Sequence, residues 1–279
     1  MLLKSIIPYV QLAPFIRSFW IFESDYGHPV TSSRIIAPNA CVKIVLPFEN
    51  NLVAESQSVT QHHPESRLQF IGNADEPYVV STSARRSGTL IIELTPQGAC
   101  HFAPFSLHEV TNNIVPFASI YGNEAVRLEE RLANTPNPVQ KAVLLQDFLV
   151  KKLGRVSIQQ EIVDFAVSAI TSSTGQISIR SLEHQTGYSR RYLDILFLRY
   201  VGISPKTLAS ISRFQHFHLL WAKNPTPDFY RDEIFRFYHD QSHFIKEFKR
   251  FSGYSPKQYG TVDNEFGRLF YQDYFENFG

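Results

Sequence analysis

The alternation of apolar and polar positions changes character about halfway along the chain. Between residues 15 and 116 the apolar runs are short, and Pro, Gly and Asn separate them. The runs that predict strands are 19–22, 34–36, 42–48, 68–71, 78–80 and 89–94. Many short strands with turn signals between them predict a β-sandwich or a small barrel. The polar stretch 50–66 is interpreted as a mobile loop.

Helical spacing of the apolar residues begins at about Asn123. Residues 124–132 form a first predicted helix, the pair Asn137-Pro138 opens a second, and residues 157–170 form a third. The polar run 171–175 is predicted to be a linker, and we place a domain boundary there. Near the end of the chain, aromatic residues recur at every fourth position. This spacing predicts an amphipathic C-terminal helix over 261–279.

Residues 186–256 contain two copies of one sequence pattern, 51 positions apart. Phe197, Arg199 and Gly202 correspond to Phe248, Arg250 and Gly253, and the run Ser204-Pro205-Lys206 corresponds to Ser255-Pro256-Lys257. In each copy an apolar stripe at helical spacing ends at a glycine, which terminates a helix in the left-handed conformation at little cost. A Ser-Pro pair then starts the next helix. Two copies are too few for a solenoid, so we predict a duplicated unit.

The first copy reads as a helix-turn-helix, with a helix over 179–185, a tight turn at Gly187-Tyr188 and a second helix capped by Ser189. The second helix of this motif enters the DNA major groove, and exposed residues early in it contact base edges. Candidate DNA-contacting residues are Ser189, Arg190, Arg191, Asp194, Ile195 and Arg199 in the first copy, and Asp240, Gln241, Ser242, Lys246 and Lys249 in the second. Arginine can pair with guanine and glutamine with adenine, each worth roughly 1–3 kcal/mol of discrimination. The plainer alternative is a set of solvated surface charges.

Some positions fit the motif less well. Ile195 and Leu198 are apolar on the expected groove-facing side, where they can meet thymine methyl groups or another protein. His243 is expected to be a buried or half-buried packing residue. In the helix before the second copy, 228–238, Phe237 takes the place of the turn glycine. Either that helix is shifted, with Ile234 and Phe235 facing inward, or the second motif is partly degenerate; we favour the shifted helix.

Charge is distributed unevenly along the 279 residues. Residues 175–260 contain thirteen Lys or Arg and seven Asp or Glu, a net charge of +6, while the whole chain carries +1. The remainder therefore carries −5, and a basic module joined to an acidic one is typical of a DNA-binding domain with a partner domain.

Cys41 and Cys100 have no metal or redox spacing. Without an apolar run of ~20 residues or a secretory signal, we expect a cytoplasmic protein that does not enter a membrane.

Four blocks together resemble the AraC/XylS family of bacterial transcription regulators: 186–193, Gly202-x-Ser204-Pro205-Lys206, Arg213-Phe214-Gln215 and 240–244. The resemblance covers roughly 178–259. It implies an α+β two-domain protein, with a cupin-like β-rich sensor domain at 1–122 and a helical dimerisation and linker region at 123–174. An all-α domain with two helix-turn-helix motifs at 175–260 and the helix at 261–279 follow. The implied partners are double-stranded DNA, a second copy of the chain, a small-molecule effector and RNA polymerase.

The sequence contains no glycine-rich phosphate loop, no His-Glu-x-x-His pair and no Gly-x-Ser-x-Gly elbow, so we expect no enzyme. His62 and His63 with His101 or His108 could gather a metal, but their spacing does not favour a site, and no cofactor is expected. A small apolar or aromatic effector is compatible with the 14% aromatic content. Two hypotheses remain: an effector-responsive transcription regulator, and an adapter of regulator descent that acts mainly through protein contacts.

Overall fold

The computed structural model describes residues 2–25, 35–56, 60–154, 157–223, 237–238 and 240–259. The predicted C-terminal helix at 261–279 lies outside these residues. So does most of the helix predicted at 228–238, including Ile234 and Phe235. Phe237 and Tyr238 are described, and both are buried against the second core.

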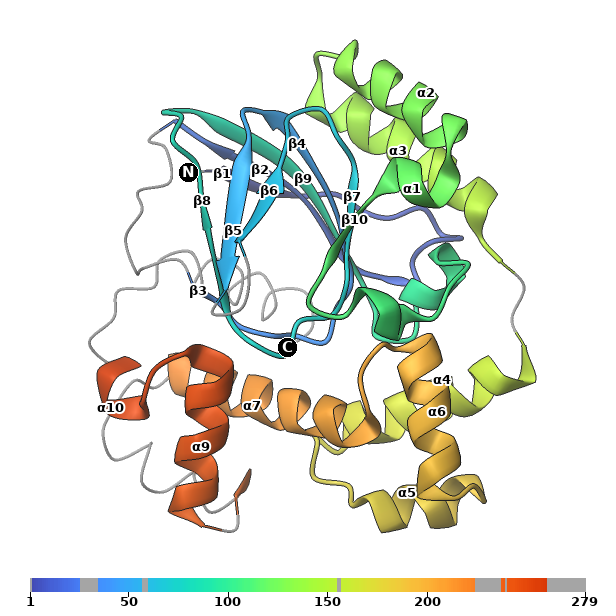
Figure 1. The fold of residues 1–279 in the computed structure, drawn as a ribbon, viewed down its shortest axis with the longest axis vertical. Helices are drawn as coiled ribbons and strands as arrows, with labels where there is room; N and C mark the ends of the chain where they lie inside the picture. The colour runs from blue at the N-terminus through green and yellow to red at the C-terminus, as the bar shows by residue number, and fades with distance from the viewer. Residues whose placement is uncertain are drawn as a thin grey trace.

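The N-terminal half of the chain forms two antiparallel sheets (Figure 1). The strands are β1 (Leu2–Ser5), β2 (Ile16–Ser24), β3 (Ile35–Ile36), β4 (Lys43–Glu49), β5 (Leu52–Ser56), β6 (Thr60–His63), β7 (Gln69–Ile71), β8 (Tyr78–Ser81), β9 (Ser87–Leu94) and β10 (Ile114–Pro116). In the described residues, the six-stranded sheet has the order β1-β2-β9-β4-β7-β10 and the four-stranded sheet the order β3-β8-β5-β6. The expected cupin-like, β-rich domain is confirmed, but its sheets do not close into a barrel.

The strict alternation of side chains gives the six-stranded sheet two different faces. On β9, Leu90, Ile92 and Leu94 belong to the first hydrophobic core, whereas Thr89, Ile91 and Glu93 line a cavity. The same alternation on β2 and β4 sends Phe19 and Ile44 to the core and their neighbours to the cavity. The four-stranded sheet lies across this cavity, so the sheets form its opposite walls.

The interpretation of residues 50–66 as a mobile loop is wrong. They contain the hairpin β5–β6, with Leu52 paired with His63 and Glu55 with Thr60. Leu52 and Ala54 are buried, and so is His63. The segment is polar overall, but Leu52 and Ala54 are two positions apart on the strand, so both side chains point to the same face and line the cavity. The edge strands β1 and β10 were not predicted either.

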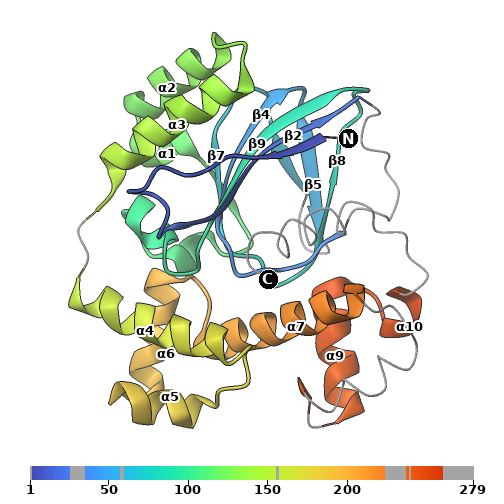
Figure 2. The ribbon, with the colours of Figure 1, turned by 180° about the vertical axis from the view of Figure 1, so that it is seen from behind.

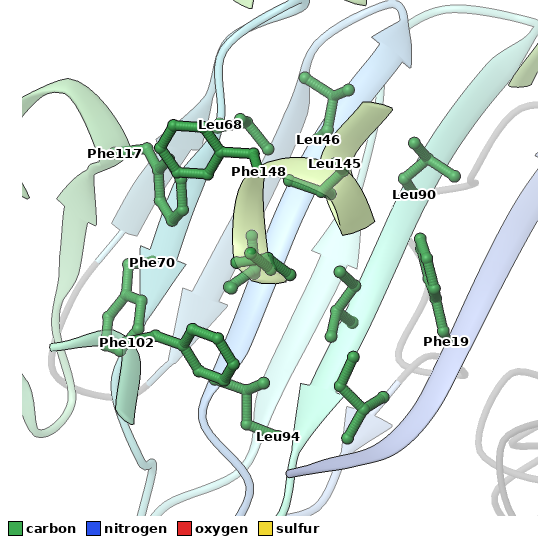
Figure 3. Close-up of a cluster of buried hydrophobic side chains, with 14 of the residues drawn as sticks. Phe19, Leu46, Leu68, Phe70, Leu90, Leu94, Phe102, Phe117, Leu145 and Phe148 are labelled. Atoms are coloured by element: carbon green, nitrogen blue, oxygen red, sulfur yellow. The ribbon is translucent and has the colours of Figure 1, made fainter. Parts of the chain in front are cut away.

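Short helices and a helical pair cover the other face of the six-stranded sheet. They are η1 (Ala99–Phe102), η2 (Leu107–Val110), α1 (Phe117–Tyr121), α2 (Asn123–Ala133) and α3 (Pro138–Lys152). Asn137 caps α3 by accepting hydrogen bonds from the amides of Val139 and Gln140, as its position before proline predicts. Figure 3 shows Leu145 of α3 near Leu46 of the sheet and Phe148 of α3 beside Phe117, and all four belong to the first hydrophobic core.

The remaining helices share a second core. They are α4 (Ile158–Ser172), α5 (Ile179–Thr186), α6 (Arg190–Tyr200), α7 (Pro205–Lys223), α9 (Gln241–Ser252) and α10 (Pro256–Tyr259). The all-α C-terminal domain expected from the sequence is confirmed. Buried residues of α4, such as Val163 and Val167, pack with this core. Helix α4 therefore shares its core with the helices that follow it, and Ala37 and Ala40 of the N-terminal half also contribute to that core.

Candidate DNA-binding interface and ligand cavity

The first helix-turn-helix unit is built from α5 and α6. Gly187 ends α5 with φ +74°, the left-handed conformation that glycine adopts without strain, and nothing lies within 4 Å of the position a Cβ would take. Ser189 then caps α6 by accepting a hydrogen bond from the amide of Tyr192 at 3.4 Å. Glu183 of α5 accepts a second one, from the amide of Arg190 at 2.6 Å. Leu182, Leu193 and Phe197 are buried between the helices.

The polar candidates of α6 lie at two different ends of the helix. Ser189, Arg190 and Arg191 are exposed at the N-terminal tip. Asp194 is half-buried and its carboxylate lies 3.8 Å from the Arg190 guanidinium, so it steadies that arginine one turn away. Arg199 is exposed at the opposite end of α6, where its guanidinium lies over the Tyr200 ring at 5.2 Å. It is therefore separated from the tip that holds the other candidates.

The two apolar positions of α6 differ from each other. Ile195 is 54% exposed on the same turn as Asp194. Leu198 is half-buried, and its carbonyl accepts a hydrogen bond from Ser106 of the N-terminal domain at 3.4 Å. Leu198 thus belongs to the contact between the domains, and Ile195 is the exposed apolar residue of this recognition helix.

The second recognition helix is α9. Asp240 caps it by accepting a hydrogen bond from the amide of His243 at 2.8 Å, and Gly253 ends it with φ +78°. The predicted residues Gln241, Ser242, Lys246 and Lys249 are all exposed. The stripe Phe244, Phe248 and Phe251 is fully buried, which keeps this polar face outward.

His243 corrects an expectation. Its side chain is 49% exposed, with Nε2 lying 3.7 Å from Glu247, and it stands next to Ser242 on the face of α9 that carries the candidates. Its position third after the cap already placed it on the polar face of the helix.

The long helix α7 lies between the two recognition helices in the chain. Its apolar stripe of Leu208, Ile211, Phe214 and Phe217 is buried in the shared core. Figures 1 and 2 show α6 and α9 at opposite ends of α7 and on the same side of it. The C-terminal ends of both recognition helices face the β-rich domain, so their N-terminal tips extend away from it.

One segment of the β-rich domain, 72–77, contacts both recognition helices at those C-terminal ends. The Asn73 side chain donates to the carbonyl of Val201 at 2.6 Å, just beyond α6. Asp75 accepts from the Arg250 guanidinium of α9 at 2.7 Å. Thr111, next to this segment, donates to the carbonyl of Gly202 at 2.7 Å. Arg250 forms an ion pair with the β-rich domain, so its guanidinium is engaged there, unlike the ammonium groups of the exposed lysines of α9.

The cavity between the sheets has a volume of about 140 Å³. Its walls carry Trp20, Phe22 and Tyr78 together with aliphatic side chains, and a charged cluster of Arg17, Lys43 and Glu93 lies at one end. Gly72, Ala74 and Glu76 of the segment 72–77 line it too, as does Gln215 of α7. Gln215 donates a hydrogen bond to the carbonyl of Pro38, which joins α7 to the mouth of the cavity.

Two further findings concern other classes of function. Within the described residues, no group of three His, Cys, Asp or Glu side chains lies close enough to hold a metal ion. No described helix combines the length and the apolar character needed to cross a bilayer.

Comparison with known proteins gives a match for the β-rich domain. Residues 4–116 match the family model described as "Domain of unknown function (DUF6597)". No curated protein sequence matches the chain.

Similar solved structures extend over both domains. ToxT from Vibrio cholerae has 10% sequence identity, covering 88% of this chain and 97% of that one with a TM-score of 0.48. Wild-type ToxT with a bound unsaturated fatty acid, from strain SCE256 of the same organism, has 12% identity, covering 88% and 96% with a TM-score of 0.46. The AraC-like transcriptional activator CuxR has 14% identity and covers 74% of each chain, with a TM-score of 0.25. In its order of a cupin-like sheet domain followed by a helical domain, the chain is similar in fold to these structures.

Proposed function

We propose that this protein is a sequence-specific, DNA-binding transcription regulator of the AraC type that responds to a small-molecule effector. The observation that carries the proposal is the matched pair of recognition helices. Each begins at a side-chain cap, Ser189 or Asp240, and presents exposed polar residues on its first two turns. Each has its opposite end against the β-rich domain, so both tips are free to approach one ligand together.

The length of α7 supports binding across successive major grooves. Its 19 residues span about 28 Å at 1.5 Å per residue. Successive turns of a DNA major groove are roughly 34 Å apart. Recognition helices that lie at both ends of α7 are therefore spaced for adjacent turns on one face of the duplex.

The proposed roles follow from the exposed chemistry. Arg190 and Arg191 pair with guanine edges or phosphates, with Asp194 orienting Arg190. Gln241 and His243 provide hydrogen-bonding groups for bases, and Lys246 and Lys249 neutralise phosphates. Ile195, at 54% exposure, contacts thymine methyl groups.

Response to an effector is supported by the segment 72–77. Three of its residues line the cavity, while Asn73 and Asp75 hold the ends of α6 and α9. A ligand that shifts this segment changes the relative placement of the two recognition helices, and so changes affinity for DNA. A ligand acts in this way only through different affinities for the two arrangements.

A homodimer is the assembly we propose, with α3 at its centre. Val139 and Val143 lie one turn apart on α3 and are 37% and 40% exposed. As a DNA-binding regulator, the protein would act in the cytoplasm, with RNA polymerase as a further partner.

An adapter that works through protein contacts is the alternative, and exposed Ile195 and Ile245 on the recognition helices favour it. The dependence of binding on salt concentration distinguishes the DNA-binding regulator from the adapter. Phosphate binding weakens by about 0.9 log unit per log unit of salt for each neutralised phosphate, whereas an apolar contact is nearly independent of salt.

The test is selection of bound fragments from a genomic DNA pool by the purified protein, at low and near-physiological salt. Arg191→Ala is compared with Arg131→Ala, an exposed arginine on α2 of the other domain. Recovery of particular fragments that is lost with Arg191→Ala and retained with Arg131→Ala supports the proposal. A folded protein that retains no DNA at either salt would favour the adapter.

A further inference from the structure

We propose that the cavity between the sheets binds a small, neutral, aromatic molecule with one hydroxyl group, which hydrogen-bonds to His63 and Thr89. This inference rests on the effector-responsive function proposed above and names the chemical class of the effector.

Strand register divides the cavity into layers. Glu93 pairs with Ser18 of β2 and with Lys43 of β4, which places the charged groups in one layer. Ile91 pairs with Trp20 and Val45 in the next layer. Thr89 pairs with Phe22 and forms the last. Glu93 and Thr89 are four positions apart on β9, so the charged layer and the far end of the cavity are about 13 Å apart.

The facing sheet places His63 at the same end as Thr89. Tyr78 hydrogen-bonds with Lys43 and pairs with Ser56, so this end of β5 lies at the charged layer. Leu52, at the other end of β5, pairs with His63 and follows directly on the turn after β4. His63 and Thr89 both line the cavity, from opposite sheets and at the end away from the charged layer, and the His63 side chain also lies beside Gln69 of β7.

The charged layer is satisfied by its own contacts. The Lys43 ammonium donates to the Asn39 side chain at 3.1 Å and to the carbonyl of Cys41 at 3.3 Å, and lies 3.6 Å from Glu93. Burial opposes its charge, but Tyr78 and Glu93 outweigh burial and raise the pKa of Lys43. The Glu93 carboxylate in turn accepts from Asn39 at 2.7 Å and from Ser18 at 3.1 Å. An anionic ligand would have to displace Glu93 from Lys43 and then leave that carboxylate buried without its cation, which is costly.

The far end has unmet hydrogen bonds. His63 is 3% exposed and Thr89 1% exposed, yet His63 Nδ1 and Thr89 Oγ1 have no hydrogen-bond partner within the described part of the chain. Buried polar atoms are nearly always paired, so two such atoms on the walls of one cavity call for an occupant. Burial lowers the pKa of His63 to about 4, so its ring is neutral near pH 7. A hydroxyl group is the matching occupant, because it can donate to one atom and accept from the other.

The size and lining of the cavity indicate the size and polarity of the ligand. A dry cavity of about 150 Å³ accommodates benzene, and this one measures about 140 Å³. Trp20 and Phe22 provide ring faces, and Val45, Ile91 and Ala54 provide aliphatic contacts between them. A single substituted ring fits this space, with its hydroxyl group directed toward the far end.

Three ethylbenzenes that differ only in the para substituent test the inference by calorimetry on the full chain: 4-ethylphenol, 4-ethyltoluene and 4-ethylbenzoate. We expect 4-ethylphenol to bind more tightly than the other two. Thr89→Val and His63→Leu each weaken its binding by about three- to tenfold, the loss for one neutral hydrogen bond. The control Thr60→Val, at an exposed position of β6, leaves affinity unchanged. Thermal unfolding of each variant verifies that it is folded.

Tighter binding of 4-ethylbenzoate, equal binding of 4-ethyltoluene, or a 4-ethylphenol affinity that Thr89→Val leaves unchanged would each overturn the inference, as would no binding of any probe at millimolar concentration. Genomic fragments are bound by the same preparations in parallel. Fragment recovery without 4-ethylphenol binding refutes the ligand class and leaves the regulator standing. Binding of 4-ethylphenol without fragment recovery supports the site and refutes the regulator.

Discussion

The guanidinium of Arg213 on α7 forms a bidentate ion pair with the carboxylate of Glu247 on α9, in which Nη2 lies 3.0 Å from Oε1 and 2.9 Å from Oε2. Glu247 is buried, and Arg213 also donates to the carbonyl of Gly175 at 3.4 Å and lies over the Tyr238 ring. This single side chain therefore fixes the second recognition helix to α7 and to the segment between α4 and α5.

Breaking that pair should be costly. Glu247→Gln leaves a largely buried guanidinium without its counter-charge, so we expect unfolding free energy to fall by about 3–5 kcal/mol. Urea unfolding followed by circular dichroism measures it. The matched control is Asp194→Asn, which breaks the exposed pair with Arg190 and should change stability by at most about 0.5 kcal/mol. Equal effects of the two substitutions would show that Arg213 and Glu247 do not hold α9.

Two glycines with the same backbone conformation should respond differently to alanine. Gly175 and Gly187 both have φ +74°. A Cβ on Gly175 would lie 2.0 Å from the carbonyl oxygen of Ala209, whereas a Cβ on Gly187 meets nothing within 4 Å. Gly187→Ala should thus cost only the left-handed strain, about 1–2 kcal/mol. Gly175→Ala should cost clearly more, because α7 must move, and thermal unfolding of both variants gives the difference. A smaller loss for Gly175→Ala would contradict the packing of the linker on α7.

Arg191 and Lys249 should affect DNA binding in different ways. Arg191→Ala should lower affinity for the selected operator by about 1–3 kcal/mol and relax the base preference at one position. Lys249→Ala should weaken all sequences alike and reduce the salt slope by about one. Fluorescence anisotropy with operator and scrambled duplexes at several salt concentrations separates the two. Exchange of the two outcomes would show that Lys249, and not Arg191, reads a base.

Stability should fall on mild acidification. Burial lowers the pKa of His218 to about 4 from its ordinary 6.5, and that of His63 likewise. Between pH 6.5 and 4 the unfolded chain binds protons that the folded chain does not, so unfolding free energy decreases as the pH falls through this window. Each histidine contributes on the order of 3 kcal/mol. Urea titrations at several pH values test this, and His218→Gln should flatten the dependence. A dependence of the same steepness in that variant would assign the effect to other groups.

The proposed dimer predicts a change of mass. Val139→Asp together with Val143→Asp places charges on α3 where two copies would meet, so the protein should elute as a monomer in size-exclusion chromatography with light scattering. Ile158→Asp, at a 76% exposed position of α4, is the control and should leave the mass unchanged. Wild-type protein that is monomeric at every concentration tested would rule the dimer out.

The sequence by itself determined the C-terminal architecture, because the signals there are local. Ser189 and Asp240 cap the helices that follow them, and Gly187 and Gly253 end helices in the left-handed conformation, as their positions predict. These interactions span only a few residues, so they can be read from the chain directly. The same holds for Asn137 at the start of α3.

The tertiary structure alone decided what depends on distant partners. Leu52 and Ala54 lie in a polar stretch, and they form a strand because β8 and β6 pair with it and because a cavity receives their side chains. Asp75 and Arg250 are 175 positions apart, and no local pattern connects them. His63 and Thr89 line one cavity only because the two sheets face each other. Periodicity indicates which face of an element is buried. The fold determines which residues that face packs against, and here it leaves a cavity between the two sheets.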